Sequence, residues 1–575
     1  MKTISNSALI GQILIILLAS SGVYFNTLFN GFVYDDIYQV VNNPWIRDPH
    51  TIIKIFSTGA WGFNATETNY YRPFMHLIYM FTYALFKLEP WGYHLVNIVF
   101  HAANSILAFF VTSEVMKMTR QDPRGLWTFM PLIAAIIFSV HPIHTEAVAW
   151  IGGIPDLSFT LFFLLSLYLY IIAEKKEPKM EAFFLGVSIV SFFIAMLCKE
   201  PAATLPLVIL LYDLSFNRSR MSVSFCTKRY SFYFVVLGSY FIIRLAALGG
   251  FSPVNKHSEF TLFQSFLNIF PLFTKYVYFL FIPVNLKAWH SFQPVLNTYD
   301  LKFLSALGLT LSFFLFSLYT FRANKIIFFG ICLFIVPLLP ALYIPGMGEN
   351  PFAERYLYLP SLGFALLASM LIVKLSAVTS YGKIVVSALF LILFAFYSTE
   401  TFSRNYAWKD ELSFWTATVR ESPDEPLPHY NLGAALERHG HLDEAIEEYQ
   451  KAISLKPASV AYKALGEVYY RKGYKNKAVL EYYKALELEP QSSEMHNEAG
   501  IILMETGNFD KAQEHFRKAV DLVPDNPKLR YNLAMALSKN EKIPEAIEQL
   551  KIAVKLDPSQ AAFSSALKKL SAEKN

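Results

Sequence analysis

Eleven apolar runs in the first 400 residues constrain this chain more than any other feature. A bilayer offers no water to backbone polar groups, so a segment that crosses it must be helical and about 20 residues long. The runs span residues 8–25, 93–116, 127–140, 154–173, 181–197, 201–216, 230–248, 301–321, 326–343, 356–373 and 383–397. Only 17% of the 575 residues are charged, against about 25% in soluble proteins. The sequence therefore predicts an all-α, multi-pass membrane protein with about 11 spans.

Short basic loops between these runs predict the orientation. Lys and Arg are enriched in the cytoplasmic loops of membrane proteins. Five basic clusters lie at residues 117–124, 175–179, 218–229, 322–325 and 374–383. All five share the side of Lys2 if two further apolar stretches, 74–86 and 262–281, lie at the outer surface without a net crossing. We also expect the run 8–25 to stay as an anchor, since no convincing signal-peptide cleavage site follows it.

An odd number of spans places the two ends of the chain on opposite sides. The N-terminus is then cytoplasmic, and the residues after the last span are non-cytoplasmic. Four polar segments share that outer side: 26–72, 141–155, 285–300 and 345–355.

The C-terminal part contains an internal repeat of 33 or 34 residues. Gly433, Ala445, Tyr449, Ala452 and Pro457 recur as Gly466, Ala478, Tyr482, Ala485 and Pro490, as Gly500, Ala512, Phe516, Ala519 and Pro524, and as Ala534, Ala546, Leu550, Ala553 and Pro558. Small residues let paired helices pack closely, and proline ends the second helix of each pair. The pattern resembles the tetratricopeptide repeat (TPR), an α-solenoid whose groove usually holds a peptide.

These features divide the chain into four predicted parts. Residues 1–400 form the membrane domain, 401–425 a linker or half-repeat, 426–558 four TPR repeats, and 559–575 a capping helix and tail. The net charge is only +5, and no Lys/Arg block lies among interleaved aromatics. Nucleic acid is therefore not an expected partner. The expected partners are membrane lipid and a protein segment held by the repeats.

Polar residues stand out against this apolar background. Asp35 and Asp36 lie in the first outer segment, where ionisable groups beside a membrane are costly and often functional. His94, Asn97, His101 and Asn104 recur at helical spacing and should line one face of a spanning helix, toward the bundle interior or a cavity. The other candidates lie at outer ends of predicted helices: Arg72, His141, His144, Glu146, Asp156, Lys199, Glu354 and Arg355. His141-x-x-His144 lacks a third ligand at a suitable spacing, so we expect no metal site there.

The order of these motifs resembles the C-type (GT-C) glycosyltransferases, and within them the transmembrane and TPR-repeat O-mannosyltransferases and their bacterial relatives. The matching segments are Tyr34-Asp-Asp36, Tyr71-Arg-Pro73, Gly92-Tyr-His94 with Asn97 and His101, His141-Pro-Ile-His-Thr-Glu146, Lys199-Glu200, and Ala353-Glu-Arg-Tyr-Leu-Tyr-Leu-Pro-Ser361. Together with the repeats they cover nearly the whole chain. That family often has Gly-Arg-x-Asp where this chain has Gly153-Ile-Pro-Asp156.

The resemblance implies a polyprenyl-phosphate sugar donor, of dolichyl or undecaprenyl type, and inversion at the anomeric carbon. A phosphate leaving group needs no general acid, but the acceptor hydroxyl of a protein needs a base. We predict Asp35 as that base and Asp36 as an orienting or electrostatic group, with the reverse assignment left open.

Cations are needed to hold the phosphate. Arg72 and Arg355 are the candidates, because guanidinium matches phosphate oxygens bidentately. Arg355 could instead pair with Glu354 or anchor the interface, and Lys199 could contribute or pair with Glu200. Glu146, Asp156, Glu354 and the histidines are predicted around the sugar phosphate, and the need for a divalent metal stays open.

Two other classes of protein compete with this interpretation. A membrane-anchored TPR scaffold would have no reason to line its membrane helices with His, Asn and carboxylates. An O-antigen ligase or polymerase would carry its catalytic His and Arg in one large, late outer loop, whereas here the acidic motif is in the first. The expected compartment is either the bacterial inner membrane facing the periplasm or the endoplasmic reticulum membrane facing the lumen.

Overall fold

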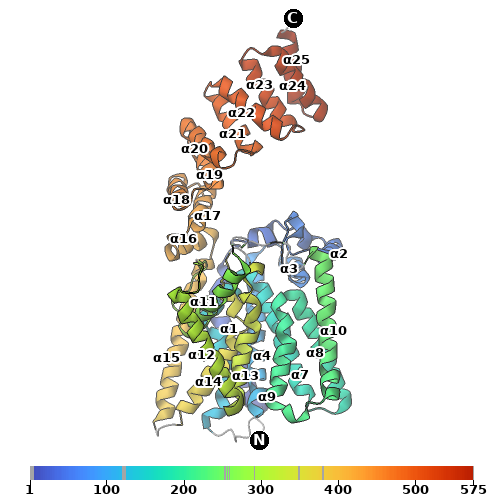
Figure 1. Ribbon diagram of the computed structural model, residues 1–575, viewed down its shortest axis with the longest axis vertical. Helices are drawn as coiled ribbons and strands as arrows, with labels where there is room; N and C mark the ends of the chain where they lie inside the picture. The colour runs from blue at the N-terminus through green and yellow to red at the C-terminus, as the bar shows by residue number, and fades with distance from the viewer. Residues whose placement is uncertain are drawn as a thin grey trace. The chain divides into compact units, whose positions relative to one another are not determined.

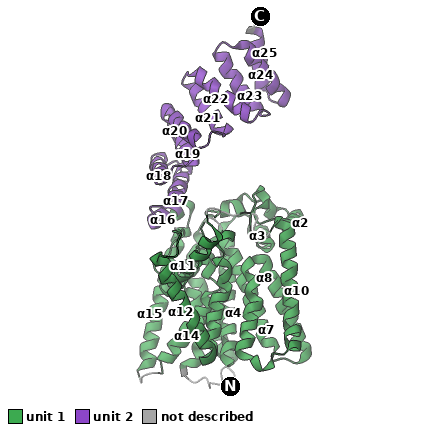
Figure 2. Ribbon diagram, viewed as in Figure 1, with its two compact units in different colours: residues 1–414 green, residues 415–575 purple. Residues whose placement is uncertain are grey.

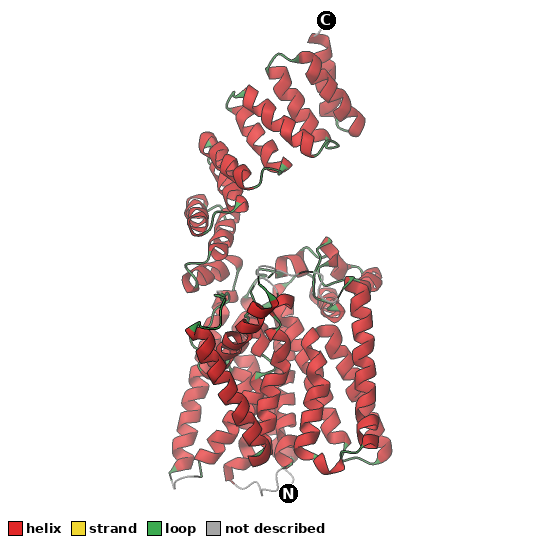
Figure 3. Ribbon diagram, in the orientation of Figure 1, coloured by secondary structure: helices red, strands yellow, loops and turns green. Residues whose placement is uncertain are grey.

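The computed structural model describes residues 5–118, 125–250, 254, 257, 260–290, 292–347, 350–377 and 381–573. Throughout these residues the regular structure is helical, without a strand (Figure 3). The chain forms two compact units, Met1–Phe414 and Trp415–Asn575 (Figure 2). The all-α fold predicted from the apolar runs and the repeats is confirmed.

The first unit is a bundle of apolar helices (Figure 1). Its α-helices are α1 (Asn6–Gly22), α2 (Ile52–Ser57), α3 (Pro73–Phe86), α4 (Pro90–Lys117), α5 (Met130–Val140), α6 (Thr145–Ala149), α7 (Ile154–Ala173), α8 (Pro178–Cys198), α9 (Leu205–Phe216), α10 (Val223–Leu248), α11 (Leu262–Phe281), α12 (Leu301–Ala323), α13 (Lys325–Leu338), α14 (Ser361–Leu375) and α15 (Gly382–Arg404). Every one of the eleven predicted runs coincides with helical structure.

Length and hydropathy give a lower number of candidate spans than the eleven predicted. Within the described residues, seven helical segments are long and apolar enough to cross a bilayer, or eight if the bent pair Leu126–Val140 and Pro142–Ala149 is one span. Of the remaining runs, α1 and α14 are shorter apolar helices, and α9 has 12 residues. The unit is thus a multi-pass membrane domain, and the number eleven stays a prediction.

Burial separates the interior helices from the peripheral ones. α4 packs against α1, α5 and α7, and α13 packs against α9 and α14. In the apolar window of the α13 span 72% of the residues are buried, whereas only 17% are buried in those of α10, α12 and α15. α10 and α15 lie at opposite edges of the bundle in Figure 1. Their exposed apolar faces fit contact with lipid tails.

The second unit is a stack of helix pairs. The pairs are α17 (Pro426–Arg438) with α18 (Leu442–Leu455), α19 (Ser459–Arg471) with α20 (Lys475–Leu488), α21 (Ser493–Glu505) with α22 (Phe509–Leu522), and α23 (Pro527–Lys539) with α24 (Ile543–Leu556). α16 (Glu411–Glu421) precedes them and crosses the boundary between the units, and α25 (Ala561–Glu573) follows.

Repeated glycines explain how the first three pairs close. A Cβ on Gly500 would lie 2.7 Å from the Phe516 ring, and one on Gly433 2.8 Å from Tyr449, so a side chain at either position would force the neighbouring ring to move. Gly440, Gly473 and Gly507 end the first helix of their pairs with positive φ, the conformation that glycine adopts most easily. The close contacts between paired helices and the glycine turns that join them therefore both recur with the repeat period.

Candidate functional site

The four predicted outer segments meet at one end of the membrane unit. The Asp36 carboxylate accepts a hydrogen bond from the Gly152 N–H, at 2.9 Å, and so joins the first segment to the second. Glu146 of the second segment pairs with Arg355 of the fourth. Glu354 of the fourth accepts from the Lys287 N–H of the third, at 2.6 Å. These long-range contacts bring most of the predicted site residues together.

The two adjacent aspartates have different surroundings. Asp36 is fully buried, and its other oxygen accepts from the Val33 N–H at 3.0 Å. Asp35 is half-buried. Burial raises the pKa of Asp36 well above its ordinary value, the hydrogen bonds from Val33 and Gly152 oppose this, and the neighbouring Asp35 charge adds to it. Asp36 therefore serves as an anchor of the turn, and Asp35 is the more accessible carboxylate.

Tyr34 gives this turn an unusual backbone. Its φ is 54°, in the left-handed region that non-glycine residues seldom occupy. Such a conformation costs on the order of 1–3 kcal/mol and persists only where the surroundings impose it. The turn is therefore held by its contacts.

Three of the predicted cations lie in ion pairs. Arg72 pairs with Glu200 at 3.2 Å, Lys199 with Asp156 at 2.5 Å, and Arg355 with Glu146. Lys199 thus does not pair with Glu200, nor Arg355 with Glu354, so both of those alternative pairings are wrong. The correct partners lie 43 and 209 residues away in the sequence, beyond the reach of local spacing.

The three cations share one neighbourhood but differ in access. The Tyr356 ring centre lies 4.9 Å from the Lys199 ammonium and 5.1 Å from the Arg355 guanidinium. The Lys199 side chain is only 3% exposed, against 17% for Arg72 and 27% for Arg355. Burial lowers the pKa of Lys199 to about 8, although Asp156 opposes the shift. The two arginines are therefore the accessible cations, with N–H donors beyond those bound to the carboxylates.

Trp150 lies between Arg355 and the turn of residues 33–36, which we call the acidic turn. Its ring lies 5.4 Å from the Arg355 guanidinium and 5.9 Å from the ring of Tyr34, the residue before Asp35. A half-buried carboxylate and a partly exposed arginine thus lie near the same indole ring. The carboxylate can deprotonate a hydroxyl, and the arginine can hold a phosphate.

The polar stripe on α4 faces the bundle interior. His94, Asn97, His101 and Asn104 are all at most 1% exposed. Asn97 donates to the carbonyls of Val148 and Trp150, and Asn104 donates to that of Leu157. Asn97 therefore supports the segment before α7, which also contains the Gly152 N–H that binds Asp36, and Asn104 binds the first turn of α7. That the stripe contacts a donor stays a prediction.

The four histidines predicted at the site are hydrogen-bonded inside the protein. His101 lies 2.7 Å from the Tyr358 hydroxyl and His144 2.7 Å from the Ser361 hydroxyl, while His141 lies 3.1 Å from the Leu280 carbonyl. His94 contacts the Gly31 carbonyl at 3.4 Å. These contacts tie the outer ends of α4, α5 and α14 together.

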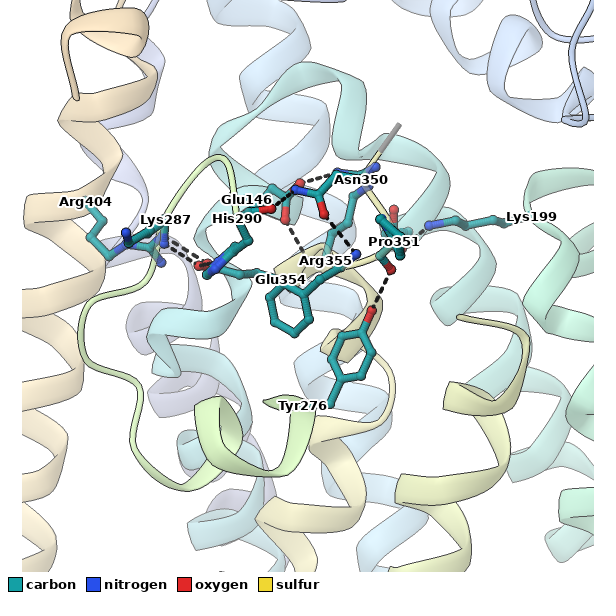
Figure 4. Close-up of polar contacts among 12 residues, drawn as sticks. Glu146, Lys199, Tyr276, Lys287, His290, Asn350, Pro351, Glu354, Arg355 and Arg404 are labelled. Carbon is teal, nitrogen blue, oxygen red and sulfur yellow. Dashed lines mark hydrogen bonds and ion pairs between the residues drawn. The ribbon is translucent and has the colours of Figure 1, made fainter. Parts of the chain in front are cut away.

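Glu354 is the centre of a second polar cluster, which Figure 4 shows. Its carboxylate is fully buried and contacts His290 and Arg404, each at 2.9 Å. Burial alone would raise the pKa of Glu354, but Arg404 and His290 hold it below its ordinary value. Arg404 also donates to the Pro142 carbonyl. Sequence reasoning missed His290 and Arg404, because no motif or spacing links them to Glu354.

Comparisons with known proteins match both units. Residues 426–459, 461–492 and 503–570 match sequence profiles described as tetratricopeptide repeats, which confirms the predicted repeats. The chain is 29% identical over 463 residues to a Caenorhabditis elegans protein named protein O-mannosyl-transferase F38B6.6, covering 78% of this chain and 63% of that protein. It is 26% identical over 497 residues to human protein O-mannosyl-transferase TMTC3, covering 78% of this chain and 52% of the relative.

Solved structures were matched as well. The crystal structure of MamA protein covers 26% of this chain and 83% of its own, with 20% identity and a TM-score of 0.25. This chain spans between about half and two thirds of the length of the curated relatives above. The resemblance to the transmembrane and TPR-repeat O-mannosyltransferases is confirmed over about three quarters of the chain.

Proposed function

We propose that this chain, whose similarity to the O-mannosyltransferases covers both its units, is a membrane glycosyltransferase. It moves a hexose, with mannose the first to test, from a polyprenyl phosphate to a hydroxyl of a protein. The observation that carries the proposal is the Trp150 ring, which lies near both Arg355 and Tyr34, the residue before Asp35. The relatives named as O-mannosyl-transferases supply the choice of sugar.

The residues support an inverting displacement. The acceptor hydroxyl oxygen attacks the anomeric carbon as the bond from that carbon to the phosphate oxygen breaks. Asp35 takes the hydroxyl proton, and the phosphate leaves as an anion without a general acid. Arg72 and Arg355 hold the phosphate through guanidinium N–H groups and offset its growing charge.

A buried ion pair favours a glycosyltransferase over a membrane-anchored scaffold. The Lys199–Asp156 pair is 3% and 4% exposed, and burying an ion pair costs about as much as its attraction returns. A pure scaffold would gain no net stability from this pair, whereas a site that binds a sugar phosphate needs positively charged side chains held in fixed positions. In an O-antigen ligase or polymerase, the acidic turn of the first outer segment would be dispensable.

The TPR repeats of the second unit are proposed to recruit the acceptor protein. TPR stacks bind extended protein segments, so the second unit recruits the acceptor on the non-cytoplasmic face, where the basic-loop pattern also places Asp35. Impermeant labelling of cysteines introduced at Ser57 and Ser492 tests this orientation. Labelling of only one of them from outside would contradict it.

The direct experiment is transfer from a defined donor. The purified full-length chain is incubated with dolichyl- or undecaprenyl-phosphate mannose and serine/threonine peptides, and mass spectrometry detects a hexose on the peptide. We expect transfer with wild type and loss with Asp35→Asn. No transfer of any hexose from either lipid would refute the proposal.

A further inference from the structure

The turn that carries Asp35 is closed tightly at both ends. The Asp36 N–H donates to the Val33 carbonyl at 3.0 Å, and the Val33 N–H donates to the Asp36 carboxylate at 3.0 Å. Tyr34 occupies the first central position with a φ of 54°, where turns of this kind usually have glycine. These hydrogen bonds fix the ends of the turn, but the Tyr34 side chain needs its own support.

Three rings supply that support. The Tyr34 ring stacks on Phe414, with centroids 5.7 Å apart and planes at 24°, and lies 5.9 Å from Trp150. Trp408 closes the group, 4.8 Å from Phe414 and stacked 5.9 Å from Trp150. We call these four residues the aromatic cluster. Trp150, Trp408 and Phe414 are 3–5% exposed, so the cluster is a packed support.

Two members of the cluster come from the segment that follows α15. That segment also bonds to the chain just before the turn: the Gly31 N–H donates to the Lys409 carbonyl at 2.7 Å, and Asn30 donates to the Asn405 carbonyl at 3.2 Å. Residues 405–414, all of them in the predicted linker, therefore contact the acidic turn and the residues just before it, although they lie nearly 400 positions away in the sequence.

We propose that Phe414 is a positioning residue for the transfer reaction: its ring, stacked on Tyr34, holds the turn so that Asp35 stays aligned with the acceptor hydroxyl. The proposal rests on the proposed function, in which Asp35 is the base. A general base must lie within hydrogen-bond reach of its proton, and a displacement of about 1 Å can cost about 100-fold in rate. Within the aromatic cluster, Trp150 is the ring that lies against Arg355, whereas Phe414 packs on Tyr34 and Trp408, so we expect loss of Phe414 to act on the turn of Asp35 and not on donor binding.

The test uses the full-length protein with saturating peptide and varied donor. Phe414→Ala should lower kcat by roughly 10- to 100-fold and leave the KM for donor unchanged, and Phe414→Tyr should restore kcat. Phe402→Ala is the matched control, because the Phe402 ring packs on Tyr406 in the same region and not on the turn. Its kcat should equal that of wild type. An unchanged kcat in folded Phe414→Ala, or a rise in donor KM alone, would overturn the inference.

A double variant distinguishes positioning from general damage. If Phe414 acts through Asp35, then Phe414→Ala should cause no further loss in the Asp35→Asn background. If the two losses multiply, this inference is refuted and the assignment of Asp35 as base stands. A fully active Asp35→Asn would refute that assignment and this inference with it, whereas the absence of transfer by wild type would refute the proposed function. Should Phe414→Ala fail to fold, Tyr34→Gly replaces it, because glycine suits the turn and removes only the ring. The same loss of kcat is expected, and wild-type kcat would overturn the inference.

Discussion

Replacing each aspartate of the acidic turn by asparagine should produce two different defects. Asp35→Asn keeps the shape of the side chain but removes the base, which typically costs about 10²–10⁴-fold in rate, or about 2.7–5.4 kcal/mol of transition-state stabilisation. Asp36→Asn instead places an NH₂ group against one of the two backbone N–H donors, Val33 or Gly152. One buried N–H then lacks an acceptor, which costs about 1–3 kcal/mol of folding stability.

Two measurements on the same preparations separate these defects. Sugar transfer to peptide under saturating donor gives kcat, and thermal unfolding in detergent gives relative stability. We expect Asp35→Asn to unfold like wild type with a strongly reduced kcat, and Asp36→Asn to unfold at a lower temperature with a smaller loss of kcat. The reasoning would be refuted if Asp35→Asn were the destabilised variant and Asp36→Asn the more strongly inactivated one.

Three further predictions concern donor binding, pH and the repeats. Arg72→Lys should raise the KM for donor several-fold with little change in kcat, because lysine lacks the bidentate fork; an unchanged KM would exclude Arg72 as a phosphate ligand. Because burial raises the pKa of Asp36, its contribution to stability is present below its unfolded pKa of about 3.9 and is lost as pH rises through the raised pKa. Between about pH 3.9 and the raised pKa of Asp36, the unfolding temperature of wild type should therefore fall more steeply with pH than that of Asp36→Asn. Parallel pH profiles of the two proteins would contradict this. Gly500→Val in the separate fragment 415–575 should lower its stability by about 1–3 kcal/mol, measured by circular dichroism in urea, because the new Cβ would lie 2.7 Å from the Phe516 ring; a matched Gly507→Asn change should be milder, since asparagine tolerates positive φ.

Much of the candidate site could be found from residue type and local spacing. The i, i+3, i+7, i+10 stripe from His94 to Asn104 follows helical geometry, and the structure places it in the bundle interior. The acidic pair at residues 35–36 stood out as two charges just beyond an apolar run. Local patterns of this kind are visible in sequence because the residues involved share one helix or one turn.

The partners of these residues could not be found in the same way. Glu200 is adjacent to Lys199 in sequence but pairs with Arg72, 128 residues away. Adjacent side chains on an extended backbone point in different directions, so adjacency in the sequence does not predict which residues form an ion pair. The choice of partner follows from how the helix ends are packed.

The sequence by itself determined which segments are helical, that the C-terminal part consists of tetratricopeptide repeats, and which residues between the apolar runs carry charge. The reason is that hydrophobic periodicity, small residues at close helix contacts and positive-φ glycines act within one or two turns of chain. Only the tertiary structure decided that Asp36 is an anchor, that Glu354 belongs with His290 and Arg404, and that Phe414 supports the turn of Asp35. Those contacts join residues 50 to 380 positions apart, and such contacts form only when the whole bundle is packed, since burial and long-range hydrogen bonding select them together.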